Sequence, residues 1–181
     1  SIFLDRSIVT MCNTHTYSGV DPGWTNLGFA KIRIDETGTP IILELGSMDP
    51  SKYGICGTVE YLRTKFGIFN SEYLCLERYV TYSGKENPAS EQILMLTGAM
   101  LLAQGKDTEV FLRRAIDWKA PLCKYLVQTK GFRNPSPSRK LDKDFSMAAA
   151  ECIFGTSSGI LNDHQADAAC LAYFPHIHKF R

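Results

Sequence analysis

Short apolar segments along the chain predict strands first and helices afterwards. Strands are predicted at 17–21, 27–34 and 41–47, and the turn-forming residues 35–38 make a hairpin of the second and third. A fourth segment at 73–77 is apolar on both faces, which is typical of a strand in the middle of a covered sheet. These strands predict the greater part of one mixed sheet.

The second half of the chain alternates between helical and strand patterns. The segment 57–66 has apolar residues three and four apart, which predicts an amphipathic helix. The helix predicted at 87–103 is apolar on nearly all sides, so we expect it to be buried on more than one face, for example by a partner subunit. The remaining elements are a strand at 107–113 and helices at 118–127, 145–154 and 163–174. The predicted fold class is α/β, a five-stranded mixed sheet flanked by helices.

Size and composition indicate one domain. A chain of 181 residues with 44% hydrophobic residues is long enough for one core and short for two. The longest stretch without a charged residue, 92–105, has 14 residues, too few to cross a membrane. Asp5 and Arg6 interrupt the apolar N-terminal segment, so a secretory signal is not predicted. We expect an intracellular protein, with cytoplasm or nucleoid, a virus-infected cell and an organelle matrix all open.

Cysteine and histidine positions do not predict a structural metal site. The six cysteines lie in apolar segments without a Cys-x-x-Cys pair, so we expect reduced core residues. His176 and His178 form a pair near the C-terminus that can bind a metal, but such terminal pairs are more often solvated.

Charge is unevenly distributed although the net charge is only +1. The span 119–143 carries a charge of +6, and the rest of the chain therefore carries −5. Such a span is typical of a surface that binds phosphates, although a basic run is often only a solvated face. Two prolines and no apolar period predict a basic, Pro- and Ser-rich loop at about 130–140 inside a domain that spans 17–181, with 1–16 as an N-terminal arm or extra strand.

Two acidic residues stand at the ends of predicted strands. Asp21 precedes Pro22 and Gly23, which turn the chain, and Glu77 ends the strand at 73–77. Simpler interpretations exist for both residues. The Asp21 side chain can bond the backbone of its own turn, and Glu77 can pair with Arg78 on the surface.

The predicted last helix begins with two potential metal ligands on one face. Asn162 or Asp163 is the expected N-cap, and His164 and Asp167, three residues apart, then lie about 5 to 6 Å from each other. An acid-rich helix start favoured by the helix dipole, with His164 a passive neighbour, remains the alternative.

These segments together resemble the RuvC family of Holliday-junction resolvases. The stretch 19–28, Gly-Val-Asp-Pro-Gly-Trp-Thr-Asn-Leu-Gly, is similar to the first motif of that family, and the start of the last helix is similar to its final motif. The resemblance covers about 17–174 and implies an RNase H-like fold and metal-dependent nuclease activity. It implies four catalytic metal ligands: Asp21, Glu77, His164 and Asp167. Many members have Asp at the position of His164, and Asp163 is the reserve ligand.

The resemblance also implies how these ligands act. Crowded carboxylates repel one another, and divalent cations relieve that repulsion. Two Mg²⁺ or Mn²⁺ ions per site, about 3.5 to 4 Å apart, can activate water and stabilise the departing 3′ oxygen. Imidazole at position 164 binds Mn²⁺ or Zn²⁺ more readily than Mg²⁺, so the preferred metal stays open. The expected reaction is phosphodiester hydrolysis that leaves 5′-phosphate and 3′-hydroxyl ends.

Candidate DNA contacts lie in two segments. The loop after Glu77 combines aromatic and basic residues that can stack on an unpaired base and hold the backbone, although such aromatics are often only anchored to the surface. In the RuvC family a side chain of this loop enters the junction crossover, and Lys119 and Lys143 match phosphate-contacting lysines. The candidates are Arg78, Tyr79, Val80, Tyr82, Lys85, Lys119, Lys130, Arg133, Arg139, Lys140 and Lys143.

The expected function is symmetric, metal-dependent resolution of four-way DNA junctions by a homodimer, whose two-fold symmetry would match that of the junction. Two alternatives are an RNase H-like nuclease acting on other branched DNA or on RNA, and a catalytically silent junction-binding protein. The partners expected are branched DNA and a second copy of the chain, and no membrane.

Overall fold

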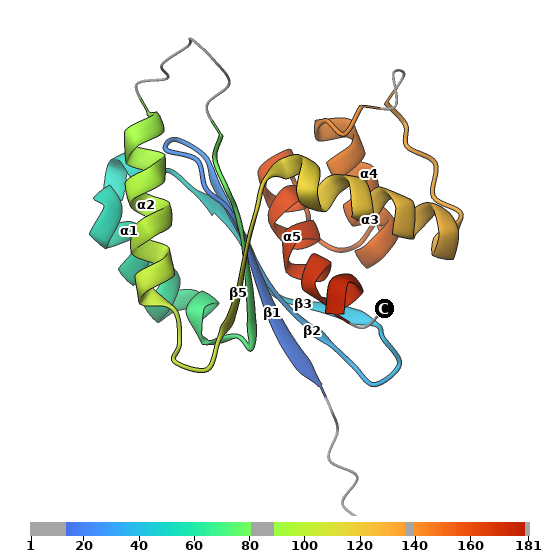
Figure 1. Cartoon of the computed structure of the whole chain (residues 1–181), viewed down its shortest axis with the longest axis horizontal. Helices are drawn as coiled ribbons and strands as arrows, with labels where there is room; N and C mark the ends of the chain where they lie inside the picture. Colours follow the sequence, from blue (N-terminus) through green and yellow to red (C-terminus); the bar gives the residue numbers. More distant parts are fainter. Residues whose placement is uncertain (1–13, 81–88, 137–139, 180–181) are drawn as a thin grey trace, which may run out of the picture.

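A five-stranded sheet with helices on both faces forms the centre of the molecule (Figure 1). The computed structural model describes residues 14–80, 89–136 and 140–179. The strands are β1 (His15–Asp21), β2 (Leu27–Ile34), β3 (Pro40–Met48), β4 (Tyr73–Glu77) and β5 (Glu109–Arg113). All the predicted strands are present, and β1 includes two residues of the predicted arm. Residues 1–13 of that arm lie outside the described residues.

The order of strands across the sheet is β3-β2-β1-β4-β5. β1 pairs with β2, and β2 with β3, in antiparallel fashion, whereas β1 pairs with β4, and β4 with β5, in parallel. The sheet is therefore mixed, as predicted. Its parallel half places the carboxyl ends of β1, β4 and β5 at one edge.

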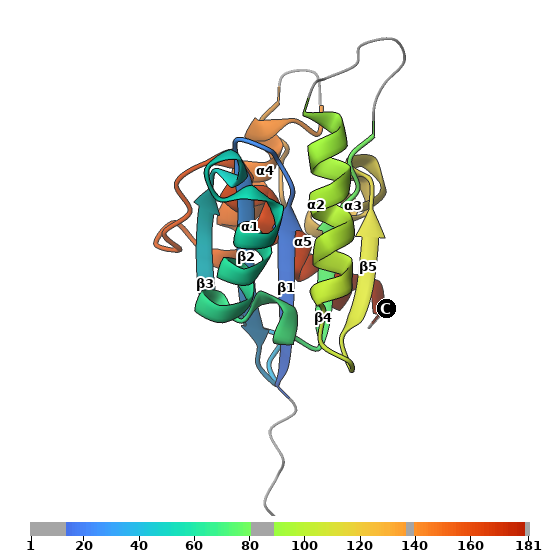
Figure 2. The ribbon, with the colours of Figure 1, turned by 90° about the vertical axis from the view of Figure 1, so that its left-hand side faces the viewer.

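Helices cover both faces of this sheet in separate groups (Figures 1 and 2). One face carries α1 (Pro50–Phe66), the short 3-10 helix η1 (Ile68–Asn70) and α2 (Ser90–Ala103). The other carries α3 (Ala115–Lys130), α4 (Lys143–Phe154) and α5 (Asp163–Lys179). β4 contributes to both cores, since Leu74 and Leu76 pack on one side and Cys75 on the other. Each of these leucines is fully buried, which contributes about 1.5 to 3 kcal/mol.

α1 begins seven residues before the predicted start at 57. The Asp49 side chain caps it by accepting a hydrogen bond from the Ser51 amide at 3.1 Å, and Pro50 occupies the first helical position. Gly54 then interrupts the helix with φ 69° and ψ 174°. The apolar period is absent before this kink, which is why the periodicity located only the second part of the helix.

α5 continues past the predicted end at 174 and through Pro175 to Lys179. Proline inside a helix removes one hydrogen bond, but Phe174 and Ile177 are 2% and 5% exposed, so tertiary packing holds the last turns. His176 packs against Tyr17, and His178 stacks on Phe174. The terminal histidines therefore belong to an ordered helix.

Two glycines allow α5 to lie close to the sheet. A Cβ atom at Gly19 would lie 2.1 Å from the carbonyl oxygen of Ala168, and one at Gly28 would lie 2.0 Å from that of His164. Any larger residue at either position would push the helix away. Gly28 thereby fixes the height of the first turn of α5 above β2.

The basic loop and the cysteines differ in part from expectation. Lys130 still belongs to α3, and the loop from Gly131 to Ser136 is anchored by Phe132 and Ser136, which are 9% and 4% exposed. Cys75 and Cys170 are buried as predicted, whereas Cys56 is exposed. Across 14–80, 89–136 and 140–179, no helix has both the length and the apolar character needed to cross a membrane.

Candidate functional site

Asp21 and Glu77 end neighbouring parallel strands and face the same side of the sheet. Val20 pairs with Leu76, so each acid is the next residue along its strand. Side chains alternate between the two faces of a strand. Because Tyr17 and Cys75 pack in the core that contains α5, Asp21 and Glu77, an even number of residues further on, point to the α5 side.

The first turn of α5 meets Asp21. The Asn162 side chain accepts a hydrogen bond from the Gln165 amide at 2.9 Å, which makes Asn162 the N-cap. His164 Nδ1 then lies 2.9 Å from Asp21 Oδ2. This hydrogen bond is the main cause that raises the pKa of His164, while partial burial opposes it. The pair favours a protonated imidazole beside a carboxylate.

Asp21, Glu77 and His164 line one cavity of about 230 Å³ at the carboxyl edge of the sheet. Tyr79 and Ile93 complete its wall together with the turn after β1. The cavity thus brings together three of the four predicted ligands from three separate elements. Its lining combines charged and apolar side chains, which is usual for a small ligand site.

Glu77 has a strongly raised pKa. Burial, followed by the neighbouring charges of Asp21 and Asp167, raises the pKa of its carboxyl from the ordinary 4.5 to about 7. The Trp118 indole opposes this shift by donating a hydrogen bond from Nε1 to Glu77 Oε2 at 2.8 Å. A carboxylate with a pKa near neutrality beside other acids is typical of a functional site.

Asp167, the fourth predicted ligand, does not line this cavity and has two close partners. Lys119 Nζ lies 2.9 Å from one of its carboxylate oxygens and 3.1 Å from the other. Ser146 Oγ donates a short hydrogen bond to Oδ1. Burial raises the pKa of Asp167, and the Lys119 cation opposes that shift. Lys119 therefore balances part of the negative charge of the site.

The metal ligands stay a prediction. In the described ranges, no group of three or more His, Cys, Asp or Glu side chains is arranged to hold a metal ion. The chemistry of the donor set nevertheless fits Mg²⁺ or Mn²⁺, because carboxylate oxygens are the ligands these ions prefer. The charge of Asp21 also raises the proton affinity of Glu77 and of Asp167, and a divalent cation relieves repulsion of this kind.

The predicted DNA-contacting loop is described only at its start. Arg78 is exposed, Val80 is half-buried, and Tyr79 lines the cavity and accepts a hydrogen bond from Ser90 Oγ at 3.2 Å. Tyr82 and Lys85 lie outside the described residues.

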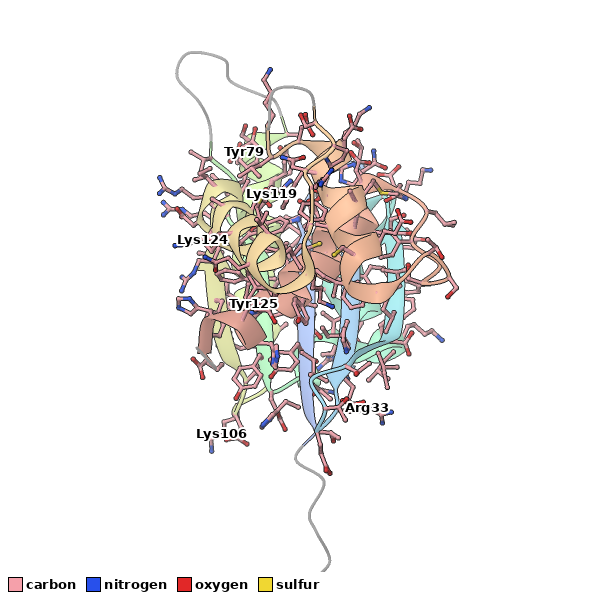
Figure 3. The ribbon with its side chains drawn as sticks, turned by 90° about the vertical axis from the view of Figure 1, so that its right-hand side faces the viewer. Arg33, Tyr79, Lys106, Lys119, Lys124 and Tyr125 are labelled. Atoms are coloured by element: carbon pink, nitrogen blue, oxygen red, sulfur yellow. The ribbon has the colours of Figure 1, made fainter. Side chains whose placement is uncertain are left out.

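The predicted basic contacts divide into two groups. Lys119 is only 7% exposed and is engaged with Asp167, so it belongs to the acidic site instead of to an open basic surface. In the view of Figure 3, Lys119 lies nearer the centre of the molecule than Lys124 does. The exposed candidates are Lys130, Arg133, Lys140 and Lys143. Arg139 lies outside the described residues.

Sequence reasoning missed Trp118 and Ser146, the hydrogen-bond donors to Glu77 and Asp167. Both lie in helices and are far in sequence from the acids that they contact. A tryptophan next to a lysine at a helix start was the visible signal for Trp118. Ser146 had none, since a serine within a helix is common.

Comparisons with known proteins bear on the fold. No protein-family model matches the chain, and no curated protein matches it in sequence. The RuvC of Thermus thermophilus in complex with a Holliday junction substrate is similar in structure, with 17% identity, a TM-score of 0.63 and coverage of 90% of this chain and 94% of that chain. Another Thermus thermophilus RuvC structure has 18% identity, a TM-score of 0.62 and the same coverage.

The yeast mitochondrial Holliday junction resolvase Ydc2 is a more distant structural neighbour. It has 15% identity and a TM-score of 0.53, with coverage of 91% of this chain and 83% of that chain. These likenesses confirm the predicted five-stranded, RNase H-like plan, and the chain has the fold of the RuvC resolvases.

Proposed function

We propose that the chain is a structure-selective endonuclease that resolves four-way DNA junctions by metal-dependent phosphodiester hydrolysis. One observation carries the proposal: Asp21 and Glu77 end adjacent parallel strands and meet the first turn of α5 at one cavity. The fold is that of a RuvC that has been seen in complex with a Holliday junction substrate. Acids gathered at such an edge are suited to bind cations that act on phosphate.

In this proposal Asp21, Glu77, His164 and Asp167 hold Mg²⁺ or Mn²⁺, two ions per site. When bound, the ions activate the attacking water and neutralise charge on the leaving 3′ oxygen. Glu77 must lose its proton to take part, and its pKa of about 7 places that step near neutral pH. The products carry 5′-phosphate and 3′-hydroxyl ends.

DNA would approach over the α3 and α4 side of the cavity. The exposed lysines and arginines of this side supply affinity through phosphates, without reading sequence. Tyr79 stands at the cavity wall, where an aromatic ring can stack on an unpaired base. Two sites, one from each subunit of a homodimer, would then cut symmetrically placed strands.

The direct test is cleavage of a synthetic four-way junction by Asp21→Asn with Mg²⁺ and with Mn²⁺. Asparagine keeps the size of the side chain and removes its charge, so we expect cutting to fall at least about 100-fold, the scale seen when a group that stabilises the transition state is lost. Junction binding in a gel-shift assay should stay close to that of the unaltered protein.

Asp107→Asn is the matched control, because Asp107 is exposed in the turn before β5. It should cut at the normal rate. Normal cutting by Asp21→Asn would exclude this site. A flap, a plain duplex and an RNA hybrid, run beside the junction, separate junction resolution from a general RNase H-like activity.

One observation favours the alternative of a silent junction-binding protein. Lys119 already pairs with Asp167, as a bound cation would. Binding of the junction by the unaltered protein with no cutting in either metal would support that alternative.

A further inference from the structure

The first turns of α3 send two consecutive side chains to two different acids of the site. Lys119 reaches Asp167 on α5, whereas Trp118 Nε1 donates to Glu77 Oε2 on β4 at 2.8 Å. Lys119 Nζ also lies 5.0 Å from the centre of the Trp118 ring. The side chains of Trp118 and Lys119 therefore contact each other as well as the two acids.

Glu77 needs such a partner because its surroundings oppose its charge. It is the last residue of a five-residue strand, and the negative charges of Asp21 and Asp167 act on it. Repulsion of this kind turns a free carboxylate outward or leads it to take up a proton. Among the described side chains, Trp118 is the donor to Glu77, and it binds Oε2 and leaves Oε1 available.

The position of Trp118 makes this hydrogen bond rigid. Its ring is 0% exposed and packs in the same core as Leu122 and Phe145. An indole nitrogen is a donor only, so it can hold a carboxylate but cannot replace it as a metal ligand. A hydrogen bond from a buried neutral donor to a charged acceptor is among the stronger ones in proteins.

We propose that Trp118 is a positioning residue that fixes the Glu77 carboxylate for cation binding. This inference deepens the proposed function and depends on it. Partners that orient a metal-binding carboxylate change metal affinity or activity by about 10- to 100-fold when they are removed. A role in packing alone would lower stability and leave the affinity of the folded protein unchanged.

The test is the affinity of the metal-free protein for Mn²⁺, measured by titration calorimetry with no DNA present. Trp118→Phe keeps an aromatic ring and removes the N–H, and we expect it to weaken Mn²⁺ binding by about 10- to 100-fold. Leu122→Ala removes another fully buried side chain of α3 that contacts the same core but donates to no acid. It should lower the melting temperature at least as much and leave Mn²⁺ affinity nearly unchanged.

A double-mutant cycle with Glu77→Gln separates positioning from packing. If Trp118 acts through Glu77, Trp118→Phe should weaken Mn²⁺ binding in the unaltered protein and have no further effect in Glu77→Gln. Equal effects in both backgrounds, or equal loss in Leu122→Ala, would overturn the inference.

The outcome also separates this inference from the proposed function. An unaltered protein that binds Mn²⁺ but cuts no junction would contradict the nuclease and leave the Trp118 test standing. In the other case, the unaltered protein cuts junctions, and Trp118→Phe binds Mn²⁺ and cuts junctions as well as the unaltered protein. That result would contradict the role of Trp118 and leave the proposed function standing.

Discussion

Glu77 combines two opposing requirements in one side chain. A cation site needs its carboxylate charged, yet burial and the charge of Asp21 raise its pKa to about 7. Groups kept in unfavourable surroundings lower the stability of the folded state, and functional sites commonly carry this cost. The cost should be measurable as a dependence of stability on pH.

Glu77→Gln should stabilise the metal-free protein above neutral pH. The pKa of Glu77 rises from its ordinary value of 4.5 to about 7 on folding, so between these values the folded state binds the extra proton. The free energy of unfolding therefore falls as the pH rises through this window, and the loss is complete above it. We expect Glu77→Gln to gain about 1 to 3 kcal/mol at pH 8 and almost nothing at pH 4, by urea denaturation in EDTA.

Glu60→Gln serves as the control for that experiment. Glu60 is exposed on α1 and pairs with Arg63 in the next turn, so its replacement should change stability little at either pH. A gain for Glu77→Gln that is equal at pH 4 and pH 8 would show that packing, and not charge, is responsible.

At the scale of elements, the contact between α5 and the sheet decides where His164 stands. β1 and β2 meet this helix through Gly19 and Gly28, at distances that leave no room for a side chain. The helix start and the strand ends are therefore held in one rigid arrangement, and the position of His164 depends on a residue 136 positions earlier in the chain.

Gly28→Ala should disturb both stability and the site. Its Cβ would overlap the backbone of His164 at 2.0 Å, so the first turn of α5 must move. Overpacking of this kind costs about 1 to 3 kcal/mol. We expect a lower melting temperature and slower junction cleavage.

Gly57→Ala is the matched substitution for comparison. Gly57 lies inside α1, and a Cβ there meets Tyr53 at an ordinary 3.5 Å. Alanine is the better helix former, so this variant should gain up to about 1 kcal/mol. A harmless Gly28→Ala would mean that α5 has more freedom than its close approach to β2 indicates.

The sequence predicted those elements whose signals are local. The apolar run before Glu77 and the cap of α5 are both visible in a few residues; the run lies where it was expected, and the cap is Asn162, one of the two expected candidates. The first turns of α1 and the last turn of α5 were not predicted. α1 starts through a cap and a kink at Gly54 without an apolar period, and α5 passes Pro175 because distant residues bury its end.

At the scale of the whole molecule, the outer face of α2 stands out. Leu94, Met95 and Leu102 are 54%, 56% and 89% exposed on a helix whose inner face is already buried against the sheet. Large exposed apolar side chains on one element are typical of an interface. They agree with the proposed homodimer, in which this face would be covered by a second copy.

Leu102→Glu should therefore weaken self-association. Placing a charge in an apolar interface leaves it without a partner after dehydration, so we expect the dissociation constant of the dimer to rise at least about 10-fold, measured by sedimentation velocity. Leu161→Glu, at a residue that is 81% exposed outside α2, should not change it. A monomeric unaltered protein, or equal effects of both variants, would contradict an α2 interface.

The site as a whole was only partly predictable. The acids at the strand ends and the start of the last helix were visible in the sequence. The resemblance of these segments to the RuvC motifs predicted that they form one metal site. The partners of those acids were not visible, because Lys119 and Trp118 reach them across 48 and 41 positions of sequence. The sequence predicted Lys119 as part of a basic surface, and only the structure shows that its ammonium group pairs with Asp167 inside the site.

The pairing of Lys119 with Asp167 bears on whether the folded protein needs a metal ion. Part of the buried negative charge is balanced from within the chain, and two apolar cores hold the sheet. Zinc fingers unfold in chelators because their binding energy is also their folding energy. If divalent ions bind here as proposed, folding does not depend on them, and we expect a chelator to stop cleavage reversibly while the protein stays folded.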